Sequence, residues 1–159
     1  MKKVLLLIMA GIFLTGCNSV AVYQDPKTVS YSLEGEYDNA KDAQEVVQVI
    51  QDNLHYAQEE DMEGYLSTLV SSAREETEAE LSSFFESYDL EHTILSIEAL
   101  DQEENRMLIK TEQQAVMVDS VDGAEQYRDH VAEANHTVIK EDGEWKIEET
   151  IMTDTLFLD

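Results

Sequence analysis

The sequence predicts an α+β domain in which N-terminal helices pack on one face of a curved antiparallel β-sheet. Two observations lead to this fold class. Apolar residues recur at helical spacing between residues 40 and 85, and from residue 93 onward β-branched and aromatic residues partly alternate with polar ones. Asp-Gly pairs at 122–123 and 142–143 are turn signals between strands. Helices followed by a run of antiparallel strands are typical of the α+β class.

Three helices are expected in the first half of the domain. The first spans about 40–59, and its apolar stripe is Ala43, Val46, Val47, Ile50, Leu54 and Ala57. Asp61 can cap a second, short helix, whose inward residues are Met62, Tyr65, Leu66 and Leu69. Ser72 and Glu75 form a capping box that opens a third helix, to which Leu81, Phe84 and Phe85 contribute the apolar side chains.

Four strands are expected after the helices. Their ranges are Thr93–Leu100, Asn105–Asp119, Gln126–Glu141 and Glu144–Phe157. In the second strand Leu108 shares its parity with Lys110 and Glu112, which predicts a bulge or a half-wet face. Trp145 and Ile147 lie on one face of the last hairpin, so Trp145 is predicted to be a structural anchor of the core.

The N-terminus has the features of an export signal. Two lysines precede an unbroken apolar run of eleven residues, Val4–Leu14. As a helix this run would be about 16 Å long, against a bilayer core of roughly 30 Å. The run is therefore too short to span a membrane, and residues 1–16 are predicted to be a signal peptide.

The signal ends in Leu14-Thr15-Gly16-Cys17, which resembles the lipobox of bacterial lipoproteins. The resemblance implies cleavage before Cys17, attachment of diacylglycerol to its thiol, and further acylation, for example by palmitate. Cys17 is the only cysteine of the chain, so an internal disulfide is impossible. The expected location is the extracytoplasmic face of the cell membrane, where lipid on Cys17 is the anchor. Residues 17–39 are predicted to be a tether, of which Val29–Leu33 could dock as an edge strand.

The charge of the mature part excludes one class of partner. The chain holds 10 Lys+Arg and 35 Asp+Glu, and removal of the two lysines of the signal leaves 8 against 35, a formal charge of −27. Such a surface repels nucleic acid and anionic lipid headgroups. The acidic runs match no calcium-binding loop, and they are interpreted as solvated ends and turns, so that neither a metal nor another cofactor is expected.

The predicted order of elements, together with the closing segment Lys140-Glu141-Asp142-Gly143-Glu144-Trp145-Lys146-Ile147, resembles the NTF2-like superfamily (nuclear transport factor 2, ketosteroid isomerase and SnoaL-like polyketide cyclase relatives). The resemblance covers residues 40–159. It implies a strongly bent sheet wrapped around helices, a cavity at the open end of this cone, and for many members a homodimer through the outer sheet face. The strand that such proteins usually place between the second and third helices is not evident near Val70.

No catalytic residue is assigned from the sequence. Polar and aromatic side chains that could reach a cavity are His55, Tyr56, Tyr65, His92, Tyr127, Asp129, His130 and His136, and the predicted pocket lining is Tyr56, Tyr65, Phe85 and Tyr127. His130 and His136 share a strand parity and could face one side of the sheet, but six residues place them about 20 Å apart, too far to share a metal ion.

Three functions remain open at this point. The first is a membrane-anchored domain that binds a small ligand or an envelope protein without catalysis. The second is an NTF2-like enzyme, an isomerase, cyclase or hydrolase acting on a small hydrophobic substrate. The third is a structural envelope protein that self-associates through its sheet. A buried carboxyl of raised pKa beside a Tyr or His would favour the enzyme, and an exposed apolar sheet face would favour association.

Overall fold

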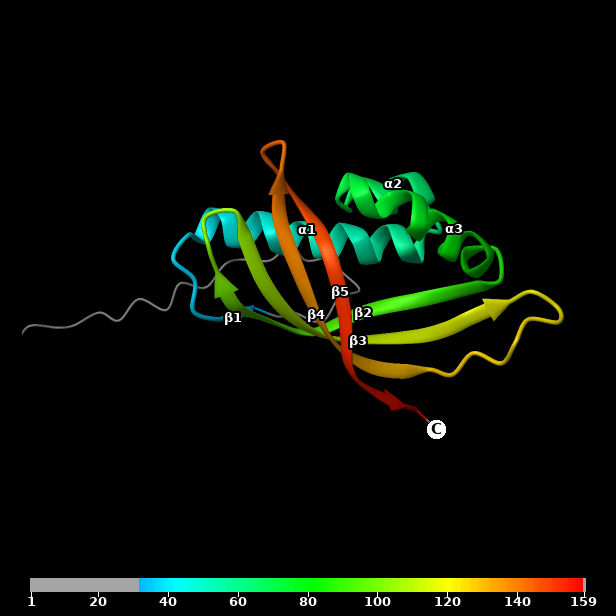
Figure 1. The fold of residues 1–159 in the computed structure, drawn as a ribbon. Coiled ribbons are helices and arrows are strands. Elements are labelled where there is room, and N and C mark those ends of the chain that lie inside the picture. Colours follow the sequence, from blue (N-terminus) through cyan, green and yellow to red (C-terminus); the bar gives the residue numbers. More distant parts are fainter. Residues whose placement is uncertain (1–31, 159) are drawn as a thin grey trace, which may run out of the picture.

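The computed structural model describes residues 32–158 (Figure 1). The helices are α1 (Ala40–Gln58), α2 (Met62–Ser67) and α3 (Arg74–Phe85), with a short 3₁₀ turn η1 (Ser71–Ala73) before α3. The strands are β1 (Leu33–Gly35), β2 (Tyr88–Gln102), β3 (Arg106–Ser120), β4 (His130–Glu141) and β5 (Glu144–Phe157). They form one sheet in the order β1-β2-β3-β4-β5, in which only β1 is parallel to its neighbour. The predicted α+β fold class is confirmed. The signal, Cys17 and most of the predicted tether lie outside the described residues.

Helix α1 forms as the sequence predicts and supplies one side of the core. It begins because the Asn39 side chain accepts hydrogen bonds from the backbone N–H groups of Lys41 and Asp42. Its buried apolar residues follow the predicted stripe and are Ala43, Val46, Val47 and Ile50. Its two ends are fixed to the same strand. The backbone N–H of Asn39 donates to Gln102 Oε1 at 3.0 Å, and that of His92 donates to Gln58 Oε1 at 3.2 Å.

The predicted start of α2 is confirmed, and the predicted start of α3 is wrong. Asp61 caps α2 by accepting a hydrogen bond from the Gly64 N–H at 3.0 Å. The predicted capping box of Ser72 and Glu75 is wrong, because α3 begins at Arg74 after Ala73, which makes no side-chain cap. Ser71, the residue before Ser72, donates its hydroxyl to Glu141 at 2.9 Å and so links this segment to the β4–β5 hairpin.

Two strands begin at positions other than those predicted. β2 starts at Tyr88, five residues before the predicted Thr93, and β4 starts at His130, four residues after the predicted Gln126. Strand β1 lies within the predicted tether and pairs with Ile97–Ala99 of β2, so Leu33 docks on the edge as expected. The remainder of the expected edge strand, residues 29–31, lies outside the described range. Gly35 has a positive φ and lies so close to the Ala99 backbone that a Cβ would collide with it.

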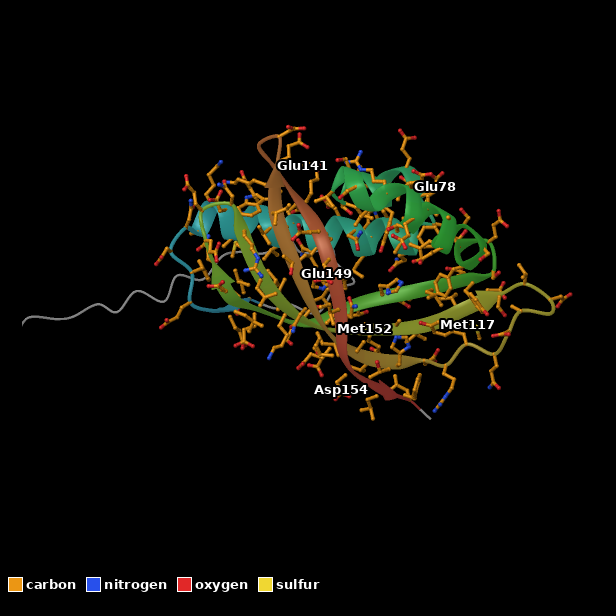
Figure 2. All side chains as sticks on the ribbon, viewed as in Figure 1. Glu78, Met117, Glu141, Glu149, Met152 and Asp154 are labelled. Carbon is orange, nitrogen blue, oxygen red and sulfur yellow. The ribbon has the colours of Figure 1, made fainter. Side chains whose placement is uncertain are left out.

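The inner and outer faces of the sheet follow from the parity of β3. Met107, Ile109 and Thr111 are buried toward the helices, whereas Leu108 and Lys110 are half-exposed and Glu112 is exposed on the other side. The half-wet face predicted from Leu108, Lys110 and Glu112 is confirmed. β5 behaves differently, because every residue from 148 to 157 is exposed. Figure 2 labels Glu149, Met152 and Asp154 along this part of the strand.

The segment between α2 and α3 makes a single strand-like contact. Leu69 forms an isolated parallel bridge with Ile147, in which the Val70 N–H donates to Ile147 O at 3.0 Å and the Ile147 N–H donates to Thr68 O at 2.9 Å. The strand that the sequence did not show near Val70 is therefore reduced to one bridge in the described chain. It still seals the edge of β5 beside the core.

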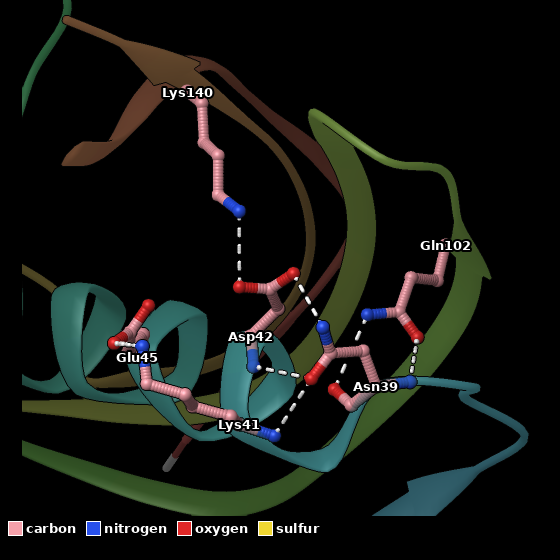
Figure 3. A network of polar contacts seen from close by, with 6 residues as sticks. All are labelled: Asn39, Lys41, Asp42, Glu45, Gln102 and Lys140. Carbon is pink, nitrogen blue, oxygen red and sulfur yellow. Dashed lines mark hydrogen bonds and ion pairs between the residues drawn. The ribbon is translucent and has the colours of Figure 1, made fainter. Parts of the chain in front are cut away.

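The β4–β5 hairpin closes one end of the core. Trp145 is 4% exposed and packs with residues of α1, β2 and β3 in the main apolar cluster. Lys140 Nζ lies 4.7 Å from the centre of the Trp145 ring and donates to Asp42 Oδ1 at 3.0 Å (Figure 3). Asp42 also accepts a hydrogen bond from the Asn39 side chain, so the hairpin is tied to the first turn of α1. No helix within residues 32–158 is long and apolar enough to cross a membrane.

Replacement of Trp145 by alanine is expected to lower the free energy of unfolding by about 3–5 kcal/mol, because it removes a large buried side chain and leaves a cavity. Urea denaturation measures this change. Trp145→Phe is the matched control. It keeps most of the apolar surface and removes a buried Nε1 that has no hydrogen-bond partner among the described residues, so less than half of the loss is expected. Unchanged melting of Trp145→Ala would show that the core does not depend on this hairpin.

Candidate functional site

The candidate site lies on the inner face of the sheet, where α1 ends. There the strand register aligns His92 of β2 with Ala115 of β3, Ala115 with His130 of β4, and His130 with Phe157 of β5. We call these four residues the histidine row. Ala115 is small, so the two imidazoles flank it from both sides. The four residues come from four different strands and lie side by side only because the strands pair in this register. The row also marks where the cover by α1 ends, because the backbone N–H of His92 donates to Gln58, the last residue of α1.

The floor beside the histidine row is made of small side chains. Ala115, Ala132 and Ala134 are at most 5% exposed, although none carries a side chain beyond Cβ. Gln113 pairs with Ala132 across the strands and points to the same inner face. Its Oε1 atom is buried and has no hydrogen-bond partner within residues 32–158. A buried acceptor without a partner is costly, and it marks a place where a ligand could donate a hydrogen bond.

Aromatic rings surround the row beyond the end of α1. Tyr127 lies 5.6 Å from Tyr88, 5.7 Å from the His130 ring and 6.3 Å from Phe84, measured between ring centres. These rings come from α3, β2, the β3–β4 loop and β4. The loop is held in place because Tyr88 donates its hydroxyl to the Glu125 carbonyl at 3.1 Å. At the far end of the row, the Arg128 guanidinium lies 4.0 Å over the Phe157 ring.

Burial shifts the pKa values of two groups at this site. Burial, aided by the nearby His130, lowers the pKa of His92 from 6.5 to about 4. Burial, aided by Asp129, raises the pKa of Tyr127 from 10.0 to about 12. Asp129 itself accepts a hydrogen bond from the Met117 N–H at 2.9 Å. His92 and Tyr127 are therefore uncharged at neutral pH, and the Arg128 guanidinium over Phe157 places a positive charge at the end of the row.

His136 has a structural role on the same face. It is 3% exposed, and its two ring nitrogens each lie 2.9 Å from a threonine hydroxyl, Nε2 from Thr111 and Nδ1 from Thr150. Burial lowers its pKa to about 4. The prediction that His130 and His136 face one side of the sheet is confirmed by the unbroken β3–β4 register. Within residues 32–158 no group of three or more His, Cys, Asp or Glu side chains could hold a metal ion.

The structure brings some of the predicted pocket residues together. Tyr65 and Phe85 meet edge-to-face at 5.9 Å, and burial raises the pKa of Tyr65. Tyr127 belongs to the separate aromatic group around the histidine row. Tyr56 lies at the corner between α1 and α2, where its ring fills the space that a side chain on Gly64 would need. His55 is exposed on α1. The assignment of these residues to a ligand pocket stays a prediction.

Sequence reasoning named His92 and His130 singly and missed their pairing, and it did not name Gln113. The pairing depends on the register of three strands and on the bulge at Ile94/Ser96, where β2 has one extra residue. A shift of one residue in any strand would move one histidine to the outer face. The available signal was the short stretch of alternating residues that contains Ala132, Ala134 and His136, whose inward side chains are small.

Several solved structures share the architecture. A protein of unknown function with a cystatin-like fold from Nostoc punctiforme aligns with a TM-score of 0.59 at 15% identity, over 74% of this chain and 93% of that chain. An NTF-2 like protein of unknown function from Shewanella oneidensis aligns with a TM-score of 0.52 at 15% identity, over 71% and 99%. A hexachlorocyclohexane dehydrochlorinase, LinA type 2, aligns with a TM-score of 0.52 at 13% identity, over 75% and 90%.

At such identities the likeness establishes the fold alone, and it defines the class: this is a domain of the NTF2-like fold, as the sequence resemblance implied. The family is more specific. The model of the C-terminal domain of the anti-sigma-I factor RsgI9 matches residues 48–158. The chain therefore belongs to the RsgI9 C-terminal domain family. Among curated proteins none matches the chain.

The two buried histidines predict a loss of stability in mild acid. Their folded-state pKa values, about 4, lie below the ordinary value of 6.5. The unfolded chain therefore binds more protons between these values, and the free energy of unfolding falls as the pH drops through 6.5 toward 4. Each histidine contributes a loss of roughly 2 kcal/mol between pH 7 and pH 5. Urea unfolding of His136→Gln should show a shallower pH dependence than the wild type, and His55→Gln should not. Equal slopes for all three proteins would contradict the assignment.

Proposed function

We propose that the chain is a lipoprotein of the extracytoplasmic membrane face, anchored through lipid on Cys17. Support comes from the Lys-rich start, the apolar run Val4–Leu14 and the Leu14-Thr15-Gly16-Cys17 segment. The acidity of the rest of the chain adds to this case. A body with a formal charge of −27 after Gly16 is repelled by anionic headgroups, so it stays at a membrane only through a covalent anchor.

We further propose that the domain binds a small, largely apolar ligand at the histidine row without transforming it. The observation that carries this proposal is the buried Gln113 Oε1, which has no partner in the described chain and lies beside the alanine floor and the histidine row. The name of the matched family, an anti-sigma-I factor, supports a regulatory setting in which an extracytoplasmic domain reports the presence of a ligand or of a partner protein in the envelope.

The chemistry at the row favours binding over catalysis. A general base works best when its pKa is near the operating pH, and His92, with a pKa of about 4, is a poor base at neutral pH. The described carboxyl groups with a shifted pKa are Glu141 and Glu144. Hydrogen bonds from Ser71 and Lys146 lower their pKa values, and both lie at the β4–β5 turn. The dehydrochlorinase shares the fold at 13% identity, which carries no reaction over to this chain.

The anchor is tested on the N-terminal peptide. Cys17 is expected to become the first residue of the mature protein, and trypsin should release residues 17–27, since Lys27 is the next basic residue. Mass spectrometry should find this peptide acylated, and the protein should incorporate labelled palmitate in a bacterial host. Cys17→Ala should abolish the label, whereas Ser19→Ala should leave it unchanged. Label retained by Cys17→Ala, or Met1 retained on the wild-type product, would rule out the lipoprotein assignment.

The ligand site is tested by native mass spectrometry of residues 18–159. A small co-purified molecule is expected on the wild type. Gln113→Leu should reduce its affinity by about tenfold, the value of one hydrogen bond to a buried acceptor, while the stability of the protein stays equal or rises. Gln114→Leu, one residue along β3 and on the outer face, is the matched control and should retain the ligand. Equal binding by both variants, or a wild type that binds neither a natural ligand nor the neutral dye N-phenyl-1-naphthylamine, would show that protein side chains fill the site.

A further inference from the structure

The outer face of the sheet carries three carboxylates directly side by side. Glu112 of β3 pairs with Glu133 of β4, and Glu133 pairs with Asp154 of β5. Glu112 belongs to the outward parity of β3, so the paired residues of β4 and β5 face the same way. Adjacent strands are about 4.8 Å apart, which places three negative charges within roughly 10 Å. We call these three residues the carboxylate row.

The carboxylate row is flanked by apolar side chains on the same face. Leu156 pairs with Val131 on one side of the row, and Ile151 pairs with Asn135 on the other. Leu156 is 66% exposed and Ile151 is 50% exposed. They belong to the stretch of β5 from 148 to 157 that is exposed throughout, and Figure 2 shows Asp154 near the end of this strand. Charge and apolar surface therefore meet in one patch, which we call the outer patch: Glu112, Val131, Glu133, Ile151, Asp154 and Leu156.

The chain supplies too little positive charge to neutralise the row. Within residues 32–158 the nearest cation is Lys110, whose Nζ lies 4.0 Å from Glu133 but 2.8 Å from Glu98. Glu112 and Asp154 have no ion pair in the same range. Like charges directly opposite each other in a sheet are destabilising, so the row lowers the stability of the isolated domain. A partner that supplies cations would relieve this repulsion.

The charge decides between the possible occupants of the outer patch. A second copy would place one carboxylate row against another, at a cost of several kcal/mol for juxtaposed like charges. An anionic lipid surface would be repelled for the same reason. We propose that the outer patch docks a basic protein segment that presents Lys or Arg and apolar side chains together on one face. The cations would meet the carboxylate row, and the apolar side chains would cover Val131, Ile151 and Leu156. This proposal requires neither the ligand site nor the lipid anchor.

The free edge of β5 favours an extended segment as the occupant. β5 is the last strand in the sheet order, and the Leu69 bridge covers its outer edge only at Ile147. The backbone groups beyond this point have no neighbouring strand in the described chain. A strand added here would present every second side chain to the outer face. A segment in which every second residue follows the order apolar, Lys or Arg, apolar would place its cation beside Asp154 and its apolar side chains beside Ile151 and Leu156.

The test uses the whole chain in discs of uncharged lipid and a fluorescent peptide in which every second residue follows the order valine, lysine, valine and the residues between them are serine. Because the entire protein is acidic, the matched control must lose the same charge elsewhere. Glu112→Gln/Glu133→Gln/Asp154→Asn is therefore compared with Glu76→Gln/Glu78→Gln/Glu80→Gln on α3, where all three side chains are exposed. At about 150 mM salt, where the screening length is about 8 Å, the first variant should bind the peptide at least about tenfold more weakly, and the second within about twofold of the wild type.

Two results would overturn the proposal. The first is an equal loss of affinity in both triple variants, which would mean that the peptide senses only net charge. The second is a self-association of the chain through this face. Ile151→Cys tests it, because Cys17 is the only other cysteine. Oxidation of this variant in membranes should give no more disulfide-linked dimer than the wild type. A dimer specific to Ile151→Cys, absent from Glu78→Cys, would identify a second copy as the occupant. Melting curves of the triple variants, expected at or above the wild-type temperature, show that they are folded.

Discussion

The mismatch in length between the main helix and the strands determines the rest of the structure. α1 has 19 residues and is about 28 Å long, whereas β2 and β3 have 15 residues each and extend over about 50 Å. One helix of this length covers only part of the sheet. The hydrogen bonds from Asn39 to Gln102 and from His92 to Gln58 fix which part, because they tie both ends of α1 to β2. The remaining inner face must be covered by other side chains or by a ligand.

The two ends of the sheet consequently have different chemistry. Over α1 the inner face is a dry core closed by Trp145 and by Lys140, whose ammonium contacts both the Trp145 ring and Asp42 (Figure 3). Beyond α1 the inner face consists of alanines, the imidazoles of His92 and His130 and an unpartnered amide oxygen, under rings from α3 and the β3–β4 loop. Each end leaves one buried polar atom without a partner in the described chain, Trp145 Nε1 at the first and Gln113 Oε1 at the second. Trp145 is enclosed in the main apolar cluster, whereas Gln113 lies on the part of the inner face beyond α1, which is the physical reason for placing the ligand there.

Local signals in the sequence predicted the elements but not their alignment. The stripe of α1, the Asp61 cap and the Asp142-Gly143 turn each depend on a few neighbouring residues, and each was found in the structure. The capping box at Ser72 was wrong because the residues before α3 form a 3₁₀ turn, in which Ser71 donates its N–H and hydroxyl to Glu141, 70 residues away. β2 was predicted too short because Tyr88–His92 are mostly polar, and they form a strand only through pairing with Ala115–Ser120. The histidine row and the carboxylate row depend on the register between strands, which composition and periodicity do not predict.

The order of the strands also bears on how the domain would be oriented at a membrane. β1, which follows the N-terminal segment, is the first strand of the sheet, and β5 is the last, so roughly 19 Å of sheet separates the edge nearest Cys17 in sequence from the free edge. Residues 18–32 between Cys17 and β1 could extend over about 50 Å, so an anchor on Cys17 would not by itself fix the orientation of the domain. Repulsion from anionic headgroups would favour orientations in which the acidic outer patch points away. The unpaired edge of β5 and the carboxylate row would then lie on the side of the domain that an approaching basic segment reaches first.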